Sequence, residues 1–284
     1  MRLVPFIFFV FVVASCNKVD DTVVPAYVTV AGFTLVTQSF QGSNSSAISE
    51  LWLYDNGNIL GVVDTPVSLP LLGTGVHTLS VFPGIKNNGI GTSRIRYPFY
   101  TSYDTTITVS AGSQYSLTPH FFYLPSANID ATRNFESGNS FVAASSNTGT
   151  IELVSDPVIA SSGVRCVRMK LPSGNSLLSY IDENNIALNA GDVAFMEMDY
   201  SCNNTFGVGM YVITDGNSSK VPVLYLTPTQ ATGDDFPTWN KIYIDLGMVA
   251  SQFPSADGFR LYVECTSGEE MEPTLYFDDI KIVK

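Results

Sequence analysis

The chain has 284 residues and a mass of 30.8 kDa, enough for one or two domains with buried cores. Charged residues make up 14% of it and hydrophobic residues 45%, a balance that excludes intrinsic disorder. The net charge of -12 disfavours nucleic-acid binding, because an acidic protein repels phosphate groups. With only two histidines, His77 and His120, the sequence excludes multi-histidine metal sites and makes a catalytic triad hard to build.

The N-terminus has the pattern of an export signal. Arg2 precedes an apolar run at residues 3–14, which is too short for a membrane span of about 20 residues. The run ends in VASC (13–16), which resembles the lipobox of bacterial lipoproteins. The resemblance implies a signal peptide at residues 1–15, cleavage before Cys16, and lipidation of Cys16 by diacylglycerol and a further acyl chain such as palmitate. The alternative is an ordinary signal peptide with a chance cysteine.

Residues 16–25 form the expected tether. Lys18 followed by Asp20 and Asp21 resembles the surface-export signal of Bacteroidota lipoproteins. This resemblance implies an outer-membrane protein anchored by lipid and facing the cell exterior. A solvated tether without a sorting role, and a periplasmic orientation, are the alternatives.

Three cysteines remain in the mature chain: Cys166, Cys202 and Cys265. The number is odd, so at least one is a free thiol or pairs between chains. Buried free thiols are the favoured interpretation. A Cys202–Cys265 bridge is the alternative in an oxidising compartment.

After residue 25, short alternating apolar runs separated by Gly, Pro, Asn, Asp and Ser predict an all-β protein. The first domain is expected at residues 26–123, with the strand number and size of an immunoglobulin-like β-sandwich. Its expected strands are 27–37, 48–55, 58–63, 67–71, 75–83, 107–110 and 114–119. Within it, LWLYDNG (51–57) and YPFY (97–100) resemble a module of surface lipoproteins, which implies no activity. Trp52 is expected in its core.

Residues 124–128 are the expected linker, and residues 129–284 the second domain. Its motifs, in chain order, are NFESG (134–138), SGVRCV (162–167), LNAGD (188–192), TWNKIYIDL (238–246) and LYFDDIKI (275–282). This order resembles the galactose-binding-like β-sandwich family, a jelly-roll fold that contains many carbohydrate-binding modules. The resemblance implies a C-terminal jelly roll that binds a glycan, with Trp239 as a packing residue. A short helical turn is expected at residues 248–252.

A structural calcium ion often joins the opening and closing segments of that family, and Glu136 and Asp278 are the matching residues. Calcium prefers six to eight oxygen ligands. Alternation places Asp278 on the same face as Ile280 and Ile282, toward the core, where an unpaired carboxylate is costly. Either a cation or hydrogen bonds from backbone amides must compensate it.

Alternation also predicts the outward residues of the second domain. Met196, Met198, Tyr200 and Cys202 are expected in the core, which turns Glu197 and Asp199 outward. If their strands share one sheet, the outward side chains form a glycan groove in which rings stack on sugars and charged groups bind hydroxyls. Its expected ligand-binding members are Tyr211, Tyr243, Arg260, Tyr262, Glu197 and Asp199. An ordinary solvated β face is the alternative.

The sequence argues against catalysis. Glu197 and Asp199 resemble the start of the catalytic motif of jelly-roll endoglucanases, whose retaining chemistry needs a second acid about 5–5.5 Å away. The matching positions hold Ser201 and Cys202. No phosphate-binding loop, serine elbow or HExxH motif occurs either, so no organic cofactor is expected.

The basic and aromatic segment at residues 94–100 is a further patch, expected to contact a partner, a glycan or the second domain. Taken together, the sequence predicts a non-catalytic surface lipoprotein that binds a glycan through its second domain, with the first domain as a spacer. The competing hypothesis is a structural or adhesive protein that binds other surface proteins and has no sugar site.

Overall fold

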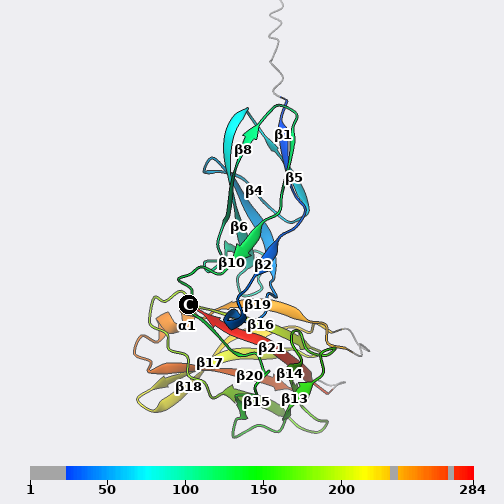
Figure 1. Ribbon diagram of the computed structural model, residues 1–284. Coiled ribbons are helices and arrows are strands. Elements are labelled where there is room, and N and C mark those ends of the chain that lie inside the picture. Colours follow the sequence, from blue (N-terminus) through cyan, green and yellow to red (C-terminus); the bar gives the residue numbers. More distant parts are fainter. Residues whose placement is uncertain (1–23, 231–235, 268–271) are drawn as a thin grey trace, which may run out of the picture.

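The computed structural model describes residues 24–230, 236–267 and 272–284. Regular structure in these residues is almost entirely strand, which confirms the predicted all-β class. The strands form two sandwiches stacked end to end, with those of the first running along the long axis of the molecule (Figure 1). The predicted signal peptide, Cys16 and residues 16–23 of the tether lie outside the described residues. Within them, no helix is long and apolar enough to cross a membrane.

The first domain packs two layers of strands around its own core. One layer has the order β4-β3-β6-β7, with β8 also paired to β6, and the other contains β5-β1-β9 and the parallel pair β10-β2. The elements are β1 (Ala26–Val30), β2 (Thr34–Val36), η1 (Ser39–Gln41), β3 (Ile48–Asp55), β4 (Asn58–Val63), β5 (Val67–Leu71), β6 (Gly75–Lys86), β7 (Arg94–Arg96), β8 (Tyr103–Val109), β9 (Gln114–Leu117) and β10 (His120–Phe122). Three expected strands, at 48–55, 58–63 and 67–71, match in both bounds, whereas the expected strand 27–37 divides into β1 and β2. The immunoglobulin-like assignment stays a prediction.

The second domain is a sandwich of two sheets, one of six strands and one of five. The first sheet has the order β13-β14-β21-β16-β19, with β11 paired to β21, and the second has the order β12-β15-β20-β17-β18. The elements are β11 (Ile129–Arg133), β12 (Phe141–Ala143), β13 (Thr150–Ser155), β14 (Arg165–Lys170), β15 (Leu177–Asp182), β16 (Phe195–Cys202), β17 (Phe206–Thr214), β18 (Asn217–Leu226), β19 (Asn240–Asp245), α1 (Gly247–Gln252), β20 (Gly258–Thr266) and β21 (Thr274–Val283). The helix α1 confirms the expected helical turn.

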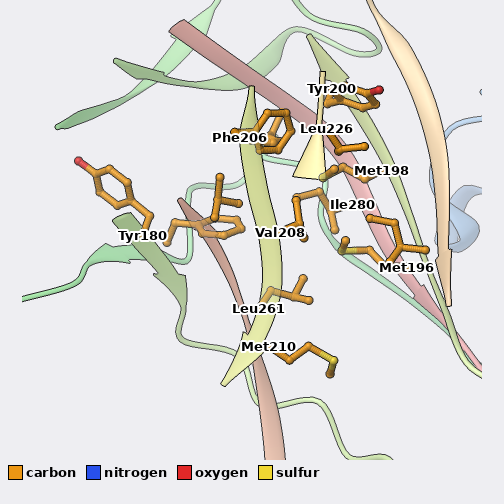
Figure 2. Close-up of a cluster of buried hydrophobic side chains, with 14 of the residues drawn as sticks. Tyr180, Met196, Met198, Tyr200, Phe206, Val208, Met210, Leu226, Leu261 and Ile280 are labelled. Atoms are coloured by element: carbon orange, nitrogen blue, oxygen red, sulfur yellow. The ribbon is translucent and has the colours of Figure 1, made fainter. Parts of the chain in front are cut away.

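The core of the second domain lies between these sheets. Met196 and Met198 of β16 face Val208 and Met210 of β17 across it (Figure 2). Every second residue of β16 is in this core, as the alternation predicts. The three cysteines are buried free thiols, and burial raises the pKa of Cys202 to about 11.

Asp278 does not share a face with Ile280, contrary to the alternation. Phe277 and Ile280 both enter the core although they are three residues apart, because β21 has a bulge opposite Met198. Asp279 takes a positive φ of 45° there. The extra residue shifts the alternation by one position, so Asp278 lies on the outer face of the sheet.

The two tryptophans have different environments. Trp52 was expected in the core, but it is half-buried on the outer face of the first domain, between the buried Leu51 and Leu53. A strand that is covered on one face only buries alternate residues, and here the leucines take that face. Trp239 has the expected packing role: its indole N–H donates to the carbonyl of Ile159 at 3.0 Å, and its ring meets Tyr276.

Candidate functional site

The six residues predicted to form one groove lie on two different sheets. Glu197, Asp199 and Tyr243 belong to β16 and β19 of the first sheet, whereas Tyr211, Arg260 and Tyr262 belong to β17 and β20 of the second. All six point away from the shared core, as expected. The two sets therefore lie on opposite outer faces of the sandwich, and the prediction of a single groove is wrong. Alternation assigns a face within a strand but does not assign the strand to a sheet.

The first set is buried beneath the first domain. The side chain of Glu197 is fully buried and accepts hydrogen bonds from the hydroxyls of Tyr97 at 2.8 Å and Tyr123 at 2.7 Å. The Lys241 ammonium lies 3.2 Å from Asp199 and 3.8 Å from Glu197. These contacts balance two buried carboxylates that would otherwise be costly.

Tyr243 completes this junction. Its hydroxyl lies 3.0 Å from that of Tyr100 and accepts the backbone N–H of Ala47 at 3.3 Å. Burial, followed by the nearby charge of Glu197, holds the pKa values of Tyr97, Tyr100 and Tyr243 well above that of a free tyrosine, so they are donors and not phenolates.

The segment at residues 94–100 therefore has the role of a domain contact. Tyr97 and Phe99 pack edge-on against Phe195 of the second domain. The alternating basic side chains, Arg94 and Arg96, stay exposed on the first domain. Of the three expectations for this segment, packing between the domains is the one that the structure contains.

The second set lies on the open outer face of the other sheet. Arg260 is exposed there and Tyr211 is half-buried, but Tyr262 is only 3% exposed. The ring of Tyr211 contacts that of Tyr262. On the Tyr262 ring, the Lys220 ammonium lies 4.5 Å from the ring centre. Burial and the neighbouring Glu264 raise the pKa of Tyr262 to about 12. Tyr262 thus supports this face and is not an open platform.

Two glycines shape the sheet beside Tyr262. A Cβ atom on Gly209 would lie 2.4 Å from the Tyr262 ring, and one on Gly207 would lie 3.1 Å from the ring of Tyr225. Both rings can rest on the backbone because these positions of β17 carry no side chain.

A hollow of about 400 Å³ opens at this point, between the Tyr225 ring and Glu264. Tyr225 is 70% exposed and presents a free aromatic surface. Glu264 forms an ion pair with Lys220 at the rim. The hollow is lined by Asn204, Thr205, Phe206, Gly207, Pro222, Tyr225, Tyr262, Glu264, Cys265, Thr266 and Ser267. An aromatic wall and a few convergent polar groups are typical of a binding site for a small polar ligand.

Sequence reasoning missed Tyr225. Simple alternation from Lys220 through Pro222 would turn Tyr225 toward the core. A bulge at Val223 adds one residue to β18, so that Tyr225 pairs with Gly207 on the outer face. A bulge of this kind leaves no reliable mark in a single sequence.

The two predicted calcium ligands hold a loop in place. Asp278 accepts the backbone N–H groups of Ser161 at 3.0 Å and Ser162 at 3.1 Å, and Glu136 accepts those of Val164 and Arg165. Residues 161–165 are therefore held by a carboxylate at each end, and N–H groups occupy oxygens that a cation would need. In the part of the chain that the structure describes, no group of three or more His, Cys, Asp or Glu side chains is placed to hold a metal ion. Backbone N–H groups are thus the partners that the structure describes for both carboxylates, and calcium at this place stays a prediction.

The chain matches no protein-family model, and a search of curated proteins found no match. Among solved structures, it is similar to a carbohydrate-binding module of the β-sandwich superfamily, with 15% identity, a TM-score of 0.42, and coverage of 81% of this chain and 83% of that one. A second is TmCBM61 in complex with β-1,4-galactotriose, with 14% identity, a TM-score of 0.34, and coverage of 53% and 94%. A third is the family 11 carbohydrate-binding module of a Clostridium thermocellum cellulosomal cellulase, with 10% identity, a TM-score of 0.36, and coverage of 55% and 94%. At this low identity and with TM-scores below 0.5, these likenesses assign neither a family nor a ligand to this chain.

Proposed function

We propose that the protein binds a glycan without transforming it, in the hollow between Tyr225 and Glu264. The observation that carries this proposal is the Tyr225 ring, which rests beside Gly207 and leaves 70% of the residue exposed toward polar groups. Aromatic rings stack on the C–H faces of sugars, and carboxylates and amides bind sugar hydroxyls. In this proposal the Glu264 carboxylate and the side-chain carbonyl of Asn204 supply those groups, since the Asn204 amide nitrogen already donates to Cys265 and Thr266.

The burial of Glu197 and Asp199 supports a role without catalysis. Both carboxylates are closed off by the first domain, so a glycan cannot reach them. Among the residues that the structure describes, Glu264 is the single carboxylate that lines the hollow, whereas glycoside hydrolysis generally needs two. Release of reducing ends from a bound polysaccharide would contradict this part of the proposal.

The proposed location is the outer membrane, with acyl chains on Cys16 and the protein facing the cell exterior. The arrangement in Figure 1 supports a spacer role for the first domain, since β1 begins at its end farthest from the second domain. An anchor before β1 would hold the sugar site away from the membrane. Replacing Cys16 with alanine should release the protein from the membrane fraction, and retention would contradict lipidation.

A glycan array on the full-length chain tests the proposed function. Tyr225→Ala should weaken binding by about tenfold or more, because it removes the stacking surface, whereas Tyr225→Phe should keep most of the affinity. Tyr27→Ala is the matched control, since Tyr27 is 41% exposed in the first domain, far from the hollow. An array without signal, or equal binding by Tyr225→Ala, would refute the proposal and favour the adhesive alternative.

A further inference from the structure

A second concave surface lies between the two domains. It is a cleft of about 510 Å³, and its two walls come from different domains. The first domain supplies residues 47–49, 86 and 88–89, and the second supplies residues 200, 224–227 and 240–243. The proposed function does not use this cleft.

The cleft is held open by hydrogen bonds and is therefore preformed. The backbone N–H of Asn88 donates to the carbonyl of Tyr243 at 2.9 Å, and the Asn88 side-chain carbonyl accepts the N–H of Asp245 at 2.8 Å. The N–H of Ala47 donates to the Tyr243 hydroxyl at 3.3 Å. With the buried contacts of Glu197, these bonds fix the domains relative to each other, so ligand binding here needs little reorganisation.

The cleft and the hollow on the second sheet share one residue. Tyr225 lines both, and it lies on β18, the strand at one edge of the second sheet. Because this exposed residue belongs to both linings, the two concave surfaces adjoin at Tyr225. A ligand stacked on Tyr225 can therefore extend in both directions.

The cleft offers hydrogen-bond donors to such a ligand. Lys86 and Asn240 are exposed at its surface, and the Asn240 amide donates one of its two N–H groups to the Tyr200 hydroxyl at 3.2 Å, whereas the Lys241 ammonium is turned to Asp199. No aspartate or glutamate occurs among the residues, all of them described, that line it. Ammonium and amide groups donate to hydroxyl oxygens, which a saccharide chain presents along its whole length.

We infer that the cleft is a second saccharide subsite, joined to the hollow by Tyr225, so that one linear oligosaccharide binds across both domains. This inference rests on the proposed glycan-binding function and specifies its ligand as an extended chain. The first domain is then part of the binding surface as well as a spacer. Short sugars fill one subsite, and longer chains gain affinity by reaching the other.

Isothermal titration calorimetry on the full-length chain tests this, with chains of two and eight units from cellulose, xylan, β-1,4-galactan and mannan. For the sugar that binds, the eight-unit chain should bind at least about tenfold tighter than the two-unit chain. The double variant Lys86→Ala/Asn240→Ala should lose this gain and keep the affinity for two units. Both side chains are exposed and the double variant gives up the hydrogen bond from Asn240 to Tyr200, so the fold should survive with a small loss of stability, and Lys170→Ala in β14 is the matched control for a lost lysine.

The outcomes separate the inference from the proposed function. Binding of two units that Tyr225→Ala and Glu264→Gln weaken, without a gain for eight units, overturns the inference and leaves the function intact. A length gain that survives in the double variant also overturns it. If no chain of either length binds, both the inference and the proposed function fall.

Discussion

Removing the hydroxyls of Tyr97 and Tyr123 should destabilise the junction of the two domains. These groups are the neutral hydrogen-bond donors to the Glu197 carboxylate, at 2.8 and 2.7 Å, and the carboxylate is fully buried. A hydrogen bond to a charged group contributes about 1.5–3 kcal/mol. The variant Tyr97→Phe/Tyr123→Phe keeps both rings and should lower the free energy of unfolding by about 3–5 kcal/mol, because a buried carboxylate loses two hydrogen-bond donors while the ammonium groups near it, Lys241 and Lys281, donate to other oxygens.

Urea unfolding followed by tryptophan fluorescence measures this loss. Each domain contains one tryptophan, Trp52 in the first and Trp239 in the second, so the emission reports on both. In the parent protein we expect one unfolding transition. In the double variant we expect either one transition at a lower urea concentration or two separate transitions. Tyr54→Phe is the control and should change stability by less than about 0.5 kcal/mol. A loss of less than about 1 kcal/mol in the double variant would refute the assignment of Glu197 to the junction.

Three further predictions concern the second domain. Burial and the charge of Asp279 raise the pKa of Asp278 to about 8 from a usual value of 3.8. Between these pH values the unfolded chain releases a proton that the folded chain keeps, so stability should fall as pH rises. The melting temperature of Asp278→Asn should fall less with rising pH than that of the parent protein. An equal fall in both proteins would contradict the raised pKa of Asp278. Because backbone N–H groups already bind Glu136 and Asp278, the melting temperature should be equal in EDTA and in excess calcium, and a rise with calcium would restore the sequence-based prediction. Gly209→Ala should destabilise the fold by about 1–3 kcal/mol in urea unfolding, since its Cβ would lie 2.4 Å from the Val221 carbonyl oxygen, and a neutral result would contradict the packing of Tyr262 on β17.

Much of the local structure follows from patterns that act over a few residues. The hairpin between β3 and β4 turns at Asn56 and Gly57, both with positive φ, as the Asp-Asn-Gly sequence predicts. The core positions of β16 follow from strict alternation. The prediction that the side chains of Glu197, Tyr211 and Tyr243 point away from the core is confirmed for the same reason.

The candidate site was predicted only in part. Arg260 and Tyr211 lie on the open face that the sequence anticipated, but Tyr262 is covered by its neighbours and Tyr225 was missed. The bulge at Val223 reverses the phase of β18. A bulge costs little free energy locally and is retained for the contacts it permits, so the residues around it carry no recognisable sequence signal for it.

The all-β class, the hairpin turns and the core-facing side chains of each regular strand follow from the residue order alone, because they depend on neighbours one or two positions away. Which strands share a sheet, and which outer face remains open, depends on how the whole chain packs. Tyr97 and Glu197 are a hundred positions apart, and their hydrogen bond closes one face of the second domain. A contact of that kind depends on how two finished domains pack, and the period of a strand contains no information about it.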